Sequence, residues 1–281
     1  MEKIKTGKQM SFETIADSYQ LIDYLDAKAR LNSSKYLYQY TTVNALVNMI
    51  RSKTLHLANA KNMNDQLEYQ NGDPKVWNDL FFSCFMMEDD ESIGMWSMYA
   101  QPWREGVKIS LPREVLRKWV ADTTEILEVS QATKQLTGRK IEDPGLFKLW
   151  ISAVAYSNYD GIDHKKDEEL LRCGNQINSN LRNVPRRSEL TGYIKDMAWS
   201  YEKEVRIKTK FANWMGFDRT AITMPDYVID SLIITPSPLF EGDLTKRIED
   251  EVNCVVNSGK SKFKGRLRIG TVCDKCSILH P

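Results

Sequence analysis

The pattern of hydrophobic and polar positions predicts that the core of the chain begins with a strand, a helix and a second strand. Residues 12–32 carry apolar side chains at helical spacing, which predicts a leading helix. Residues 35–42 are rich in tyrosine and typical of a strand, whereas 43–53 have an amphipathic helical pattern that Thr42 is well placed to cap. Residues 54–59 return to alternation and predict the second strand.

The rest of the chain mixes both kinds of element and contains no internal repeat. Strands are predicted at 79–86, 105–112, 147–157, 197–210, 226–236 and 263–270, and helices at 92–101, 113–122, 167–184 and 238–253. Residues 61–74 are a polar loop, and 124–146 give no clear pattern. We therefore expect an N-terminal helical segment at 1–34 and a single α+β domain at 35–281. Its sheet should be mixed or antiparallel with flanking helices, and a helical insertion is expected at about 113–195.

Composition and charge add few constraints. The chain has 281 residues, of which 42% are hydrophobic and 27% charged, so a packed core is feasible. With 39 basic and 38 acidic side chains the net charge is +1, and any nucleic-acid partner must be met by a local patch. No run approaches the roughly 18 apolar residues that span a bilayer, and the first 20 residues lack the apolar core of a signal peptide. We expect a cytoplasmic protein with no membrane partner.

The cysteines indicate a reducing compartment. There are five of them in no regular pattern: Cys84, Cys173, Cys254, Cys273 and Cys276. The last two form a single C-x-x-C, whereas a zinc site of this type needs a second pair of ligands and only His280 lies nearby. We interpret them as structural or incidental thiols and expect no metal.

The strongest candidate chemistry lies in "WSYEKEVRIK", residues 199–208. If this segment is a strand, Glu202, Glu204 and Arg206 project from the same face, because side chains two residues apart do so. An arginine beside two carboxylates lowers the cost of keeping both ionised. The alternative is a solvated edge strand whose charges simply face water.

Other short motifs surround this one. They are Y-x-Y-T at 38–41, N-D-x-x-E at 64–68, S-C-F at 83–85, M-W-S-x-Y-A at 95–100 and W-S-Y-E-K-E-V-R at 199–206. In this order, over most of residues 36–210, they resemble a widespread bacterial family of uncharacterised domains. That resemblance implies no particular activity.

A weaker similarity is to the ADP-ribosyltransferase superfamily. Its first motif has a His or Arg, a small residue and a Thr or Ser, and Gln39, Tyr40 and Thr41 stand in those places, with Gln39 and Tyr40 departing from the pattern. Its second motif offers a Ser or Tyr on a strand, here Ser83, and its third a catalytic glutamate, here Glu204. The resemblance implies a split sheet and NAD as co-substrate.

The resemblance also implies roles for the side chains. Glu202-x-Glu204 is similar to the E-x-E pair of arginine-modifying members. Glu204 would stabilise the positive charge that develops when the bond between nicotinamide and ribose breaks, and Glu202 would orient or deprotonate the accepting nucleophile. The residues expected to contact NAD are Gln39, Tyr40, Thr41, Asn64, Asp65, Ser83, Trp96, Tyr99 and Arg206.

The expected function is therefore transfer of ADP-ribose from NAD to a nucleic acid or protein. Basic stretches at 185–190, 258–266 and 264–268 permit a nucleic-acid acceptor. The resemblance favours a bacterial toxin or anti-phage defence effector, which would have an antitoxin partner. Two alternatives remain open: a non-catalytic module that binds a nucleotide or nucleic acid, and an NAD glycohydrolase using the same cleft.

Overall fold

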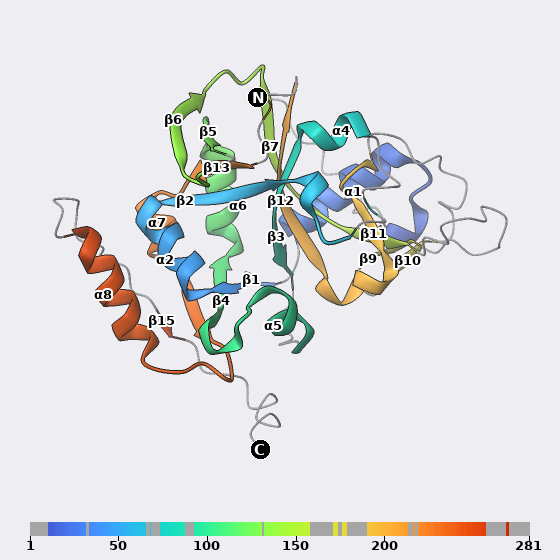
Figure 1. Ribbon diagram of the computed structural model, residues 1–281. Helices are drawn as coiled ribbons and strands as arrows, with labels where there is room; N and C mark the ends of the chain where they lie inside the picture. The colour runs from blue at the N-terminus through green and yellow to red at the C-terminus, as the bar shows by residue number, and fades with distance from the viewer. Residues whose placement is uncertain are drawn as a thin grey trace.

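The computed structural model describes residues 11–31, 34–65, 68, 74–87, 93–130, 132–157, 171–173, 176–178, 190–212, 216, 219–256 and 268–269. These residues form a large, mostly antiparallel sheet, a small four-stranded sheet and helices that flank them (Figure 1). The predicted α+β class with an antiparallel sheet is confirmed. The division into a segment at 1–34 and a domain at 35–281 stays a prediction.

The first part of the chain follows the predicted order. Its elements are η1 (Phe12–Thr14), α1 (Ser18–Leu31), β1 (Tyr36–Thr42), α2 (Val43–Ser52), β2 (Thr54–Asn59), η2 (Ala60–Asn62), α4 (Pro74–Asp79) and β3 (Leu80–Met86). As predicted, Thr42 caps α2, and its side-chain oxygen accepts a hydrogen bond from the amide of Ala45 at 3.3 Å. The helix ends at Lys53, which has a left-handed backbone.

The middle of the chain differs from the prediction. Its elements are α5 (Ile93–Tyr99), η3 (Trp103–Glu105), β4 (Gly106–Pro112), α6 (Arg113–Asp122), β5 (Ile126–Val129), β6 (Leu136–Ile141), β7 (Phe147–Ala153), β8 (Ala155–Ser157), β9 (Leu171–Cys173), β10 (Gln176–Asn178) and β11 (Ile194–Asp196). The helical insertion at 113–195 is wrong, because its described residues beyond α6 are mainly strands. The helix predicted at 167–184 is also wrong, because β9 and β10 pair antiparallel.

The last part brings two further corrections. Its elements are η6 (Met197–Glu202), β12 (Glu204–Phe211), β13 (Arg219–Thr223), α7 (Asp226–Ile229), β14 (Ile233–Pro236), α8 (Leu244–Val256) and β15 (Arg268–Ile269). The strand predicted at 197–210 begins only at Glu204, because Asp196 accepts a hydrogen bond from the amide of Ala198 at 2.8 Å and caps a 3₁₀ helix. The strand predicted at 226–236 is reduced to Ile233–Pro236, because α7 occupies Asp226–Ile229 after Pro225.

The large sheet divides at β3. Strand β12 pairs with one edge of β3 along its whole length, and β7 pairs with β12 in turn. On the other edge, β1 pairs only at Tyr38–Met86, and β2 pairs only at Ala58–Phe82 and Asn59–Phe81. Strands β1 and β2 therefore diverge from each other and leave the edge of β3 open between the two contacts.

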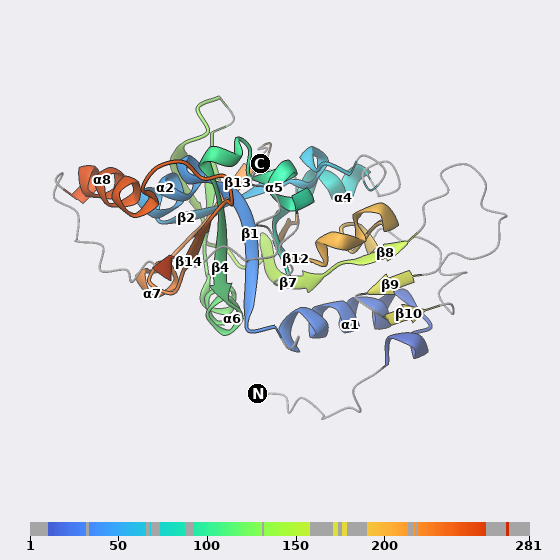
Figure 2. The same cartoon turned by 90° about the horizontal axis from the view of Figure 1, so that it is seen from below.

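Strand β12 separates the hydrophobic core from a buried polar face. Val205 and Ile207 join the core with Phe81 and Phe85 of β3. The alternate residues Glu204, Arg206 and Lys208 point to the opposite face and are also buried. The small sheet of β8, β9, β10 and β11 lies near α1 at one end of the molecule, while α2 and α8 lie together at the other end (Figure 2).

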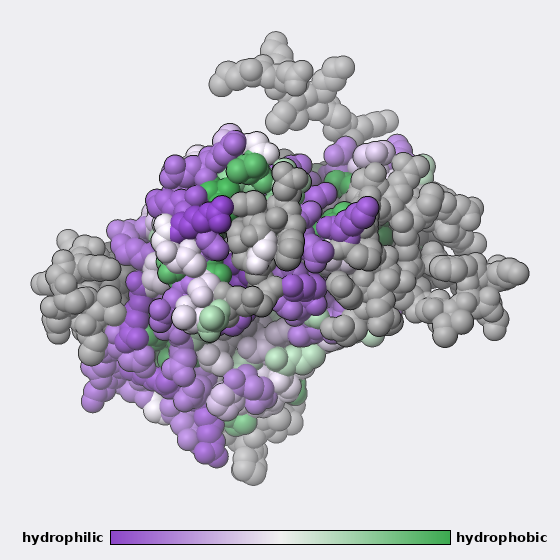
Figure 3. Space-filling model, turned by 45° about the horizontal axis from the view of Figure 1, so that its top comes forward, coloured by the Kyte–Doolittle hydropathy of each residue, from purple (hydrophilic) through white to green (hydrophobic). Residues whose placement is uncertain are grey.

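The surface is ordinary for a globular protein on the face that Figure 3 shows. Its described residues are mostly hydrophilic, and the hydrophobic ones form small separate patches. No helix in the described part of the chain has both the length and the apolar character to cross a membrane. Cys273, Cys276 and His280 lie outside the described residues, as do the basic stretches apart from Leu190 and Arg268. Within the described residues no cluster of His, Cys, Asp and Glu could hold a metal.

Candidate functional site

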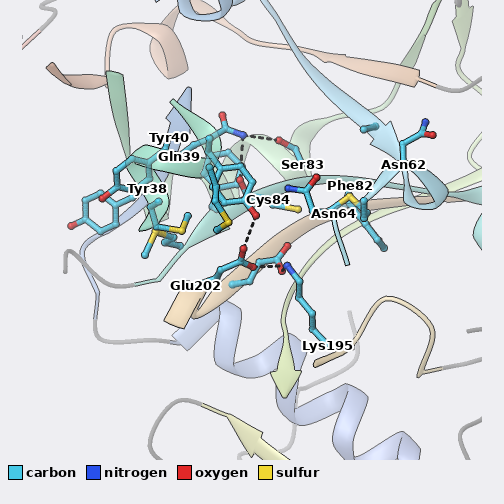
Figure 4. Close-up of a pocket in the computed structure, with 18 of the residues that line it drawn as sticks. Tyr38, Gln39, Tyr40, Asn62, Asn64, Phe82, Ser83, Cys84, Lys195 and Glu202 are labelled. Carbon is cyan, nitrogen blue, oxygen red and sulfur yellow. Dashed lines mark hydrogen bonds and ion pairs between the residues drawn. The ribbon is translucent and has the colours of Figure 1, made fainter. Parts of the chain in front are cut away.

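A cavity of about 440 Å³ lies at the division of the sheet. Its residues come from β1, β2, η2 and the two residues after it, β3, α5, β11, η6, β12 and β13. Aromatic rings and methionines form much of its wall, whereas amides and charged side chains converge at its ends. Figure 4 shows Gln39 and Ser83 on one side of the cavity and Glu202 and Lys195 on the other.

Most of the predicted site residues meet in this cavity. Those that line it are Gln39, Tyr40, Asn64, Ser83, Tyr99, Glu202 and Glu204. Thr41 lines a neighbouring cavity instead. Trp96 is buried behind the wall, edge-on to Tyr40 with ring centroids 4.7 Å apart. Asp65 and Arg206 are also buried and do not line the cavity. The NAD-contacting roles stay predictions.

The two glutamates converge, but for a different reason from the predicted one. Glu202 ends the 3₁₀ helix η6 and Glu204 begins β12, so they do not alternate along one strand. Lys203 between them has φ 42°, in the left-handed region, and turns the chain. Both carboxylates reach Lys195 on β11, whose Nζ lies 2.5 Å from Glu202 and 3.4 Å from Glu204.

Glu204 continues into a chain of buried ion pairs. The guanidinium of Arg206 donates to both oxygens of Glu204, at 2.8 and 3.1 Å, and to both oxygens of Glu68, at 2.6 and 2.9 Å. All of these side chains are at most 3% exposed. This network of ion pairs runs from Glu68 through Arg206, Glu204 and Lys195 to Glu202 and contains three carboxylates and two cations. When all five are ionised it carries one net negative charge, which faces the cavity at Glu202 and Glu204.

Glu204 stays ionised despite its burial. Burial alone would raise the pKa of its carboxyl, yet Arg206 and Lys195 together hold that pKa well below its usual range. Burial likewise opposes the charged form of Lys195, but the two glutamates outweigh it and raise the pKa of the ammonium. The backbone amide of Glu204 also donates to the hydroxyl of Tyr156 at 2.8 Å. The carboxylate is therefore a fixed negative charge, almost completely buried at the wall of the cavity.

Glu202 has the opposite tendency. Burial and the neighbouring Glu204 raise the pKa of its carboxyl above the ordinary value, although Lys195 and Tyr99 oppose the shift. The hydroxyl of Tyr99 donates to Glu202 at 2.6 Å. Two carboxyl groups that share one lysine thus differ in proton affinity, an arrangement that suits one to stabilise charge and the other to exchange a proton.

The side chain of Gln39 links β1 to the open edge of β3. Its amide nitrogen donates to the hydroxyl of Ser83 at 3.3 Å and to the carbonyl of Cys84 at 3.2 Å (Figure 4). These bonds reach the stretch of β3 that β1 does not pair with. The amide therefore compensates for part of the missing ladder, and it places no positive charge in the cavity.

A second, larger cavity of about 820 Å³ adjoins the first. It lies beside α2, β2 and the turn between β5 and β6. Gln39, Tyr40, His56 and Arg219 line both cavities, so the two adjoin at these residues, and we refer to the pair as the groove. Burial and the nearby Arg219 lower the pKa of His56, which is therefore neutral at neutral pH.

The second cavity is positively charged. Its cationic residues are Arg51, Lys134 and Arg219, and none of the described residues that line it is acidic. Arg51 is partly neutralised by Glu251, 3.8 Å away. Within the described part of the chain, Arg219 and Lys134 have no ion-pair partner. The groove thus has two carboxylates beside Lys195 at one end, Arg219 at the junction, and only cations among its charged lining residues at the other end.

Lys195, His56 and Arg219 are among the groove residues that were not predicted from the sequence. They carry no motif, and they lie on strands far apart in the chain. A lysine before two glutamates is common on solvated surfaces, so its spacing gave no signal. Only the placement of β11 beside η6 brings Lys195 to the glutamates.

The arrangement supports some kinds of chemistry and disfavours one. A fixed carboxylate at a cavity wall can stabilise a cationic centre, and aromatic faces can pack against a flat ring. Nucleophilic catalysis by Cys84 is disfavoured, because burial and Glu204 raise the pKa of its thiol and keep it protonated.

Comparison with known proteins gives a family for part of the chain. Residues 95–207 match a family described as a protein of unknown function (DUF2971). The matched span is less than half of the chain and contains Tyr99, Lys195, Glu202 and Glu204. This match agrees with the resemblance to a family of uncharacterised domains. No curated protein matches the sequence.

Two solved structures of DarT from Thermus sp. 2.9 are similar to this chain at a low level. The one in complex with carba-NAD+ has a TM-score of 0.33 and 12% identity, and covers 87% of this chain and 98% of its own. The one in complex with NAD+ has a TM-score of 0.34 and 11% identity, and covers 85% and 96%. At these TM-scores the likeness bears on neither the fold nor the function of this chain.

Proposed function

We propose that the protein is an NAD-dependent ADP-ribosyltransferase that uses Glu204 and Glu202. The reversal of charge along the groove is the observation that carries this proposal. NAD has a cationic nicotinamide ring at one end and an anionic diphosphate in its middle. The carboxylates of the first cavity complement the ring, and the cations of the second complement the diphosphate.

The residues then have distinct roles. When nicotinamide leaves with the bonding electron pair, positive charge develops on the anomeric carbon of the ribose. The ionised carboxylate of Glu204 stabilises that charge, since it is fixed by Arg206 and Lys195 and needs no rearrangement. A nucleophilic atom of the acceptor bonds to the same carbon, and its proton passes to Glu202, whose raised pKa suits a base.

The walls of the first cavity fit the nicotinamide ring. Tyr38, Tyr40 and Phe82 contribute aromatic side chains to the lining, and Met95 and Met98 contribute polarisable ones. A volume of about 440 Å³ lies within the range of small-molecule sites. Exclusion of water from such a pocket strengthens the interaction between a carboxylate and a developing cation.

The acceptor is a macromolecule under this proposal, either a nucleic acid or a protein. A cytoplasmic location, a role as a toxin or anti-phage effector and an antitoxin partner remain parts of the same prediction.

The test is nicotinamide release and label transfer. Purified protein is incubated with NAD labelled in the adenylate part and a cell extract, and the label is measured in the nucleic-acid, protein and small-molecule fractions. We expect label in one macromolecular fraction, and its loss by at least about a hundredfold in Glu204→Gln, as for removal of other transition-state charge stabilisers. Glu114→Gln, at an exposed position on α6, is the matched control.

Each outcome separates the candidate functions. Nicotinamide release with label only in small molecules would establish an NAD glycohydrolase. Neither release nor NAD binding by the wild type would refute the proposal and favour the binding module. Breaking a buried ion pair costs about 3–5 kcal/mol, so Glu204→Gln is compared with wild type by circular dichroism, and Glu202→Gln provides a second variant of the same site.

A further inference from the structure

We propose that the second cavity is the binding site for the diphosphate and adenosine part of the dinucleotide, and that Arg219 on β13 is its principal diphosphate ligand. This inference rests on the proposed function for the identity of the ligand. The location and charge of the cavity carry it independently.

Arg219 stands where the two cavities meet. It lies opposite Ala58 of β2 in the sheet, next to the position at which β2 leaves β3. It lines the carboxylate cavity and the cationic cavity alike. A single ligand that occupies both cavities must therefore pass this side chain, and the diphosphate is the part of the dinucleotide between its two ends.

Of the residues that line both cavities, Arg219 is the one that carries a charge. Gln39 is neutral and its amide nitrogen is engaged with β3. His56 is kept neutral by burial and by Arg219 itself, as its lowered pKa shows. The guanidinium is half-buried and has no ion-pair partner in the described part of the chain. Arginine in this state is well suited to bidentate binding of phosphate oxygens.

The rest of the second cavity fits a nucleoside. Its volume of about 820 Å³ accommodates a purine and a ribose, and amides and hydroxyls of Asn48, Ser52 and Gln135 line it. Lys134, at the turn between β5 and β6, adds a further cation to the lining. The absence of carboxylates among its described lining residues favours an anion over a cationic or neutral ligand.

Binding of ADP-ribose tests the proposal without any chemical step. Isothermal titration calorimetry of the full chain with ADP-ribose, ADP and nicotinamide mononucleotide is compared between wild type, Arg219→Gln and Arg219→Lys. We expect Arg219→Gln to lower the affinity for ADP-ribose and for ADP by about tenfold or more, the usual effect of losing a charged hydrogen bond. Arg219→Lys should recover part of the affinity, because it restores the charge without the planar fork.

Lys246→Gln is the matched control. It also removes one positive charge, but from an exposed position on α8 that lines neither cavity. Its affinity for ADP-ribose should equal that of wild type. The pKa of His56, followed by NMR, should rise in Arg219→Gln because the neighbouring cation is gone, which confirms that the variant is folded and locally changed.

Kinetics separate this inference from the proposed function. If wild type releases nicotinamide, Arg219→Gln should raise KM for NAD by about tenfold with little change in kcat, because the diphosphate is held equally in the ground and transition states. Unchanged affinity for ADP-ribose in Arg219→Gln would overturn the inference and leave the proposed function intact. If wild type binds ADP-ribose but releases no nicotinamide, and Arg219→Gln loses ADP-ribose binding, the inference is supported and the proposed function is refuted. If Arg219→Gln binds a single-stranded oligonucleotide more weakly than wild type but binds ADP-ribose equally well, the inference is overturned in favour of an acceptor site.

Discussion

The two cavity glutamates have the same residue type and one shared lysine, yet they hold protons differently. Glu204 accepts hydrogen bonds from Arg206 and therefore stays ionised. Glu202 depends on Lys195 and on the hydroxyl of Tyr99, and these do not fully offset its burial beside another carboxylate. The number of cations that each carboxylate contacts therefore separates their roles.

The hydroxyl of Tyr99 is expected to set the acidic side of the pH–activity profile. Tyr99→Phe removes a donor to ionised Glu202 and so raises the pKa of that carboxyl further. If Glu202 acts as the base, the acidic limb of kcat/KM for nicotinamide release should move to higher pH. In Glu202→Gln the limb should disappear, and activity should be low at every pH.

Tyr201→Phe is the control for the Tyr99 prediction. It removes a hydroxyl that donates to the sulfur of Met98 at 3.5 Å rather than to Glu202. Its pH profile should match that of wild type. If Tyr99→Phe leaves the acidic limb in place as well, Glu202 is not the group that titrates there.

Residue types and spacing predicted only part of this site. Glu202, Glu204 and Ser83 could be selected because short motifs contain them, and all three line the cavity. Lys195 and Arg219 could not, because a single cation on a strand has no distinguishing pattern. Their position in the site depends on pairing between strands that are far apart in the chain, and local residue patterns do not reveal such pairing.

Among the elements, the turn at Lys203 determines whether the glutamates meet. A lysine at φ 42° is strained by roughly 1–2 kcal/mol relative to ordinary backbone. The carbonyl of Lys203 accepts from the amide of Met87 at 3.0 Å, and its amide donates to Ser200 at 3.4 Å. These bonds fix the turn between η6 and β12 and so aim both carboxylates at Lys195.

Substitution of Lys203 should therefore depend on backbone freedom at this position. Lys203→Gly adopts the left-handed conformation easily, and we expect unfolding free energy within about 1 kcal/mol of wild type and retained nicotinamide release. In Lys203→Val the branched side chain opposes this conformation, so stability should fall by about 1–2 kcal/mol and activity should fall with it. Urea unfolding and initial rates measure both effects.

Lys210→Val on β12 is the matched control, because Lys210 is exposed and its backbone is extended. A β-branched residue is favoured there. If Lys203→Val is as stable and active as this control, the left-handed turn does not hold the site together.

Elements with a strong local pattern were predicted correctly, whereas the cap at Asp196 and the pairing of β9 with β10 were not predicted. The β1–α2–β2 unit has clear periodicity and a capping threonine, so its bounds agree closely with the prediction. In 197–202 the strand preference of Trp199 and Tyr201 was outweighed by the cap at Asp196. In 167–184 the spacing of apolar residues suggested a helix, whereas the structure has the short antiparallel strands β9 and β10 there.

At the scale of the whole molecule, the groove exists because the sheet divides. Strands β1 and β2 are consecutive strands around α2, yet they contact opposite ends of one edge of β3. A sheet with a continuous ladder there would have no open edge beside Ser83 and no space for a ligand. An α+β class follows from the sequence pattern, whereas this division depends on long-range pairing that no local pattern reveals.

The buried ion chain links this groove to the stability of the fold, and the link can be measured through pH. The folded pKa of Glu204 lies below its unfolded value, which is about 4.3 for a free glutamate. Its contribution to stability is therefore present above about pH 4 and is lost as the pH falls towards the folded pKa. The folded pKa of Glu202 lies above its unfolded value, so its effect has the opposite sign. Stability falls as the pH rises from the unfolded towards the folded pKa of that group.

Two glutamine variants should therefore show opposite pH dependence. The free energy of unfolding in urea is measured from about pH 3 to pH 7 for wild type, Glu204→Gln and Glu202→Gln. The advantage of wild type over Glu204→Gln should grow from pH 3 to about pH 5 and reach about 3–5 kcal/mol, the cost of breaking a buried pair. Its advantage over Glu202→Gln should instead shrink as the pH rises. Equal slopes for the two variants would show that Arg206 and Lys195 do not distinguish the carboxylates, and would remove the physical basis for giving them different roles.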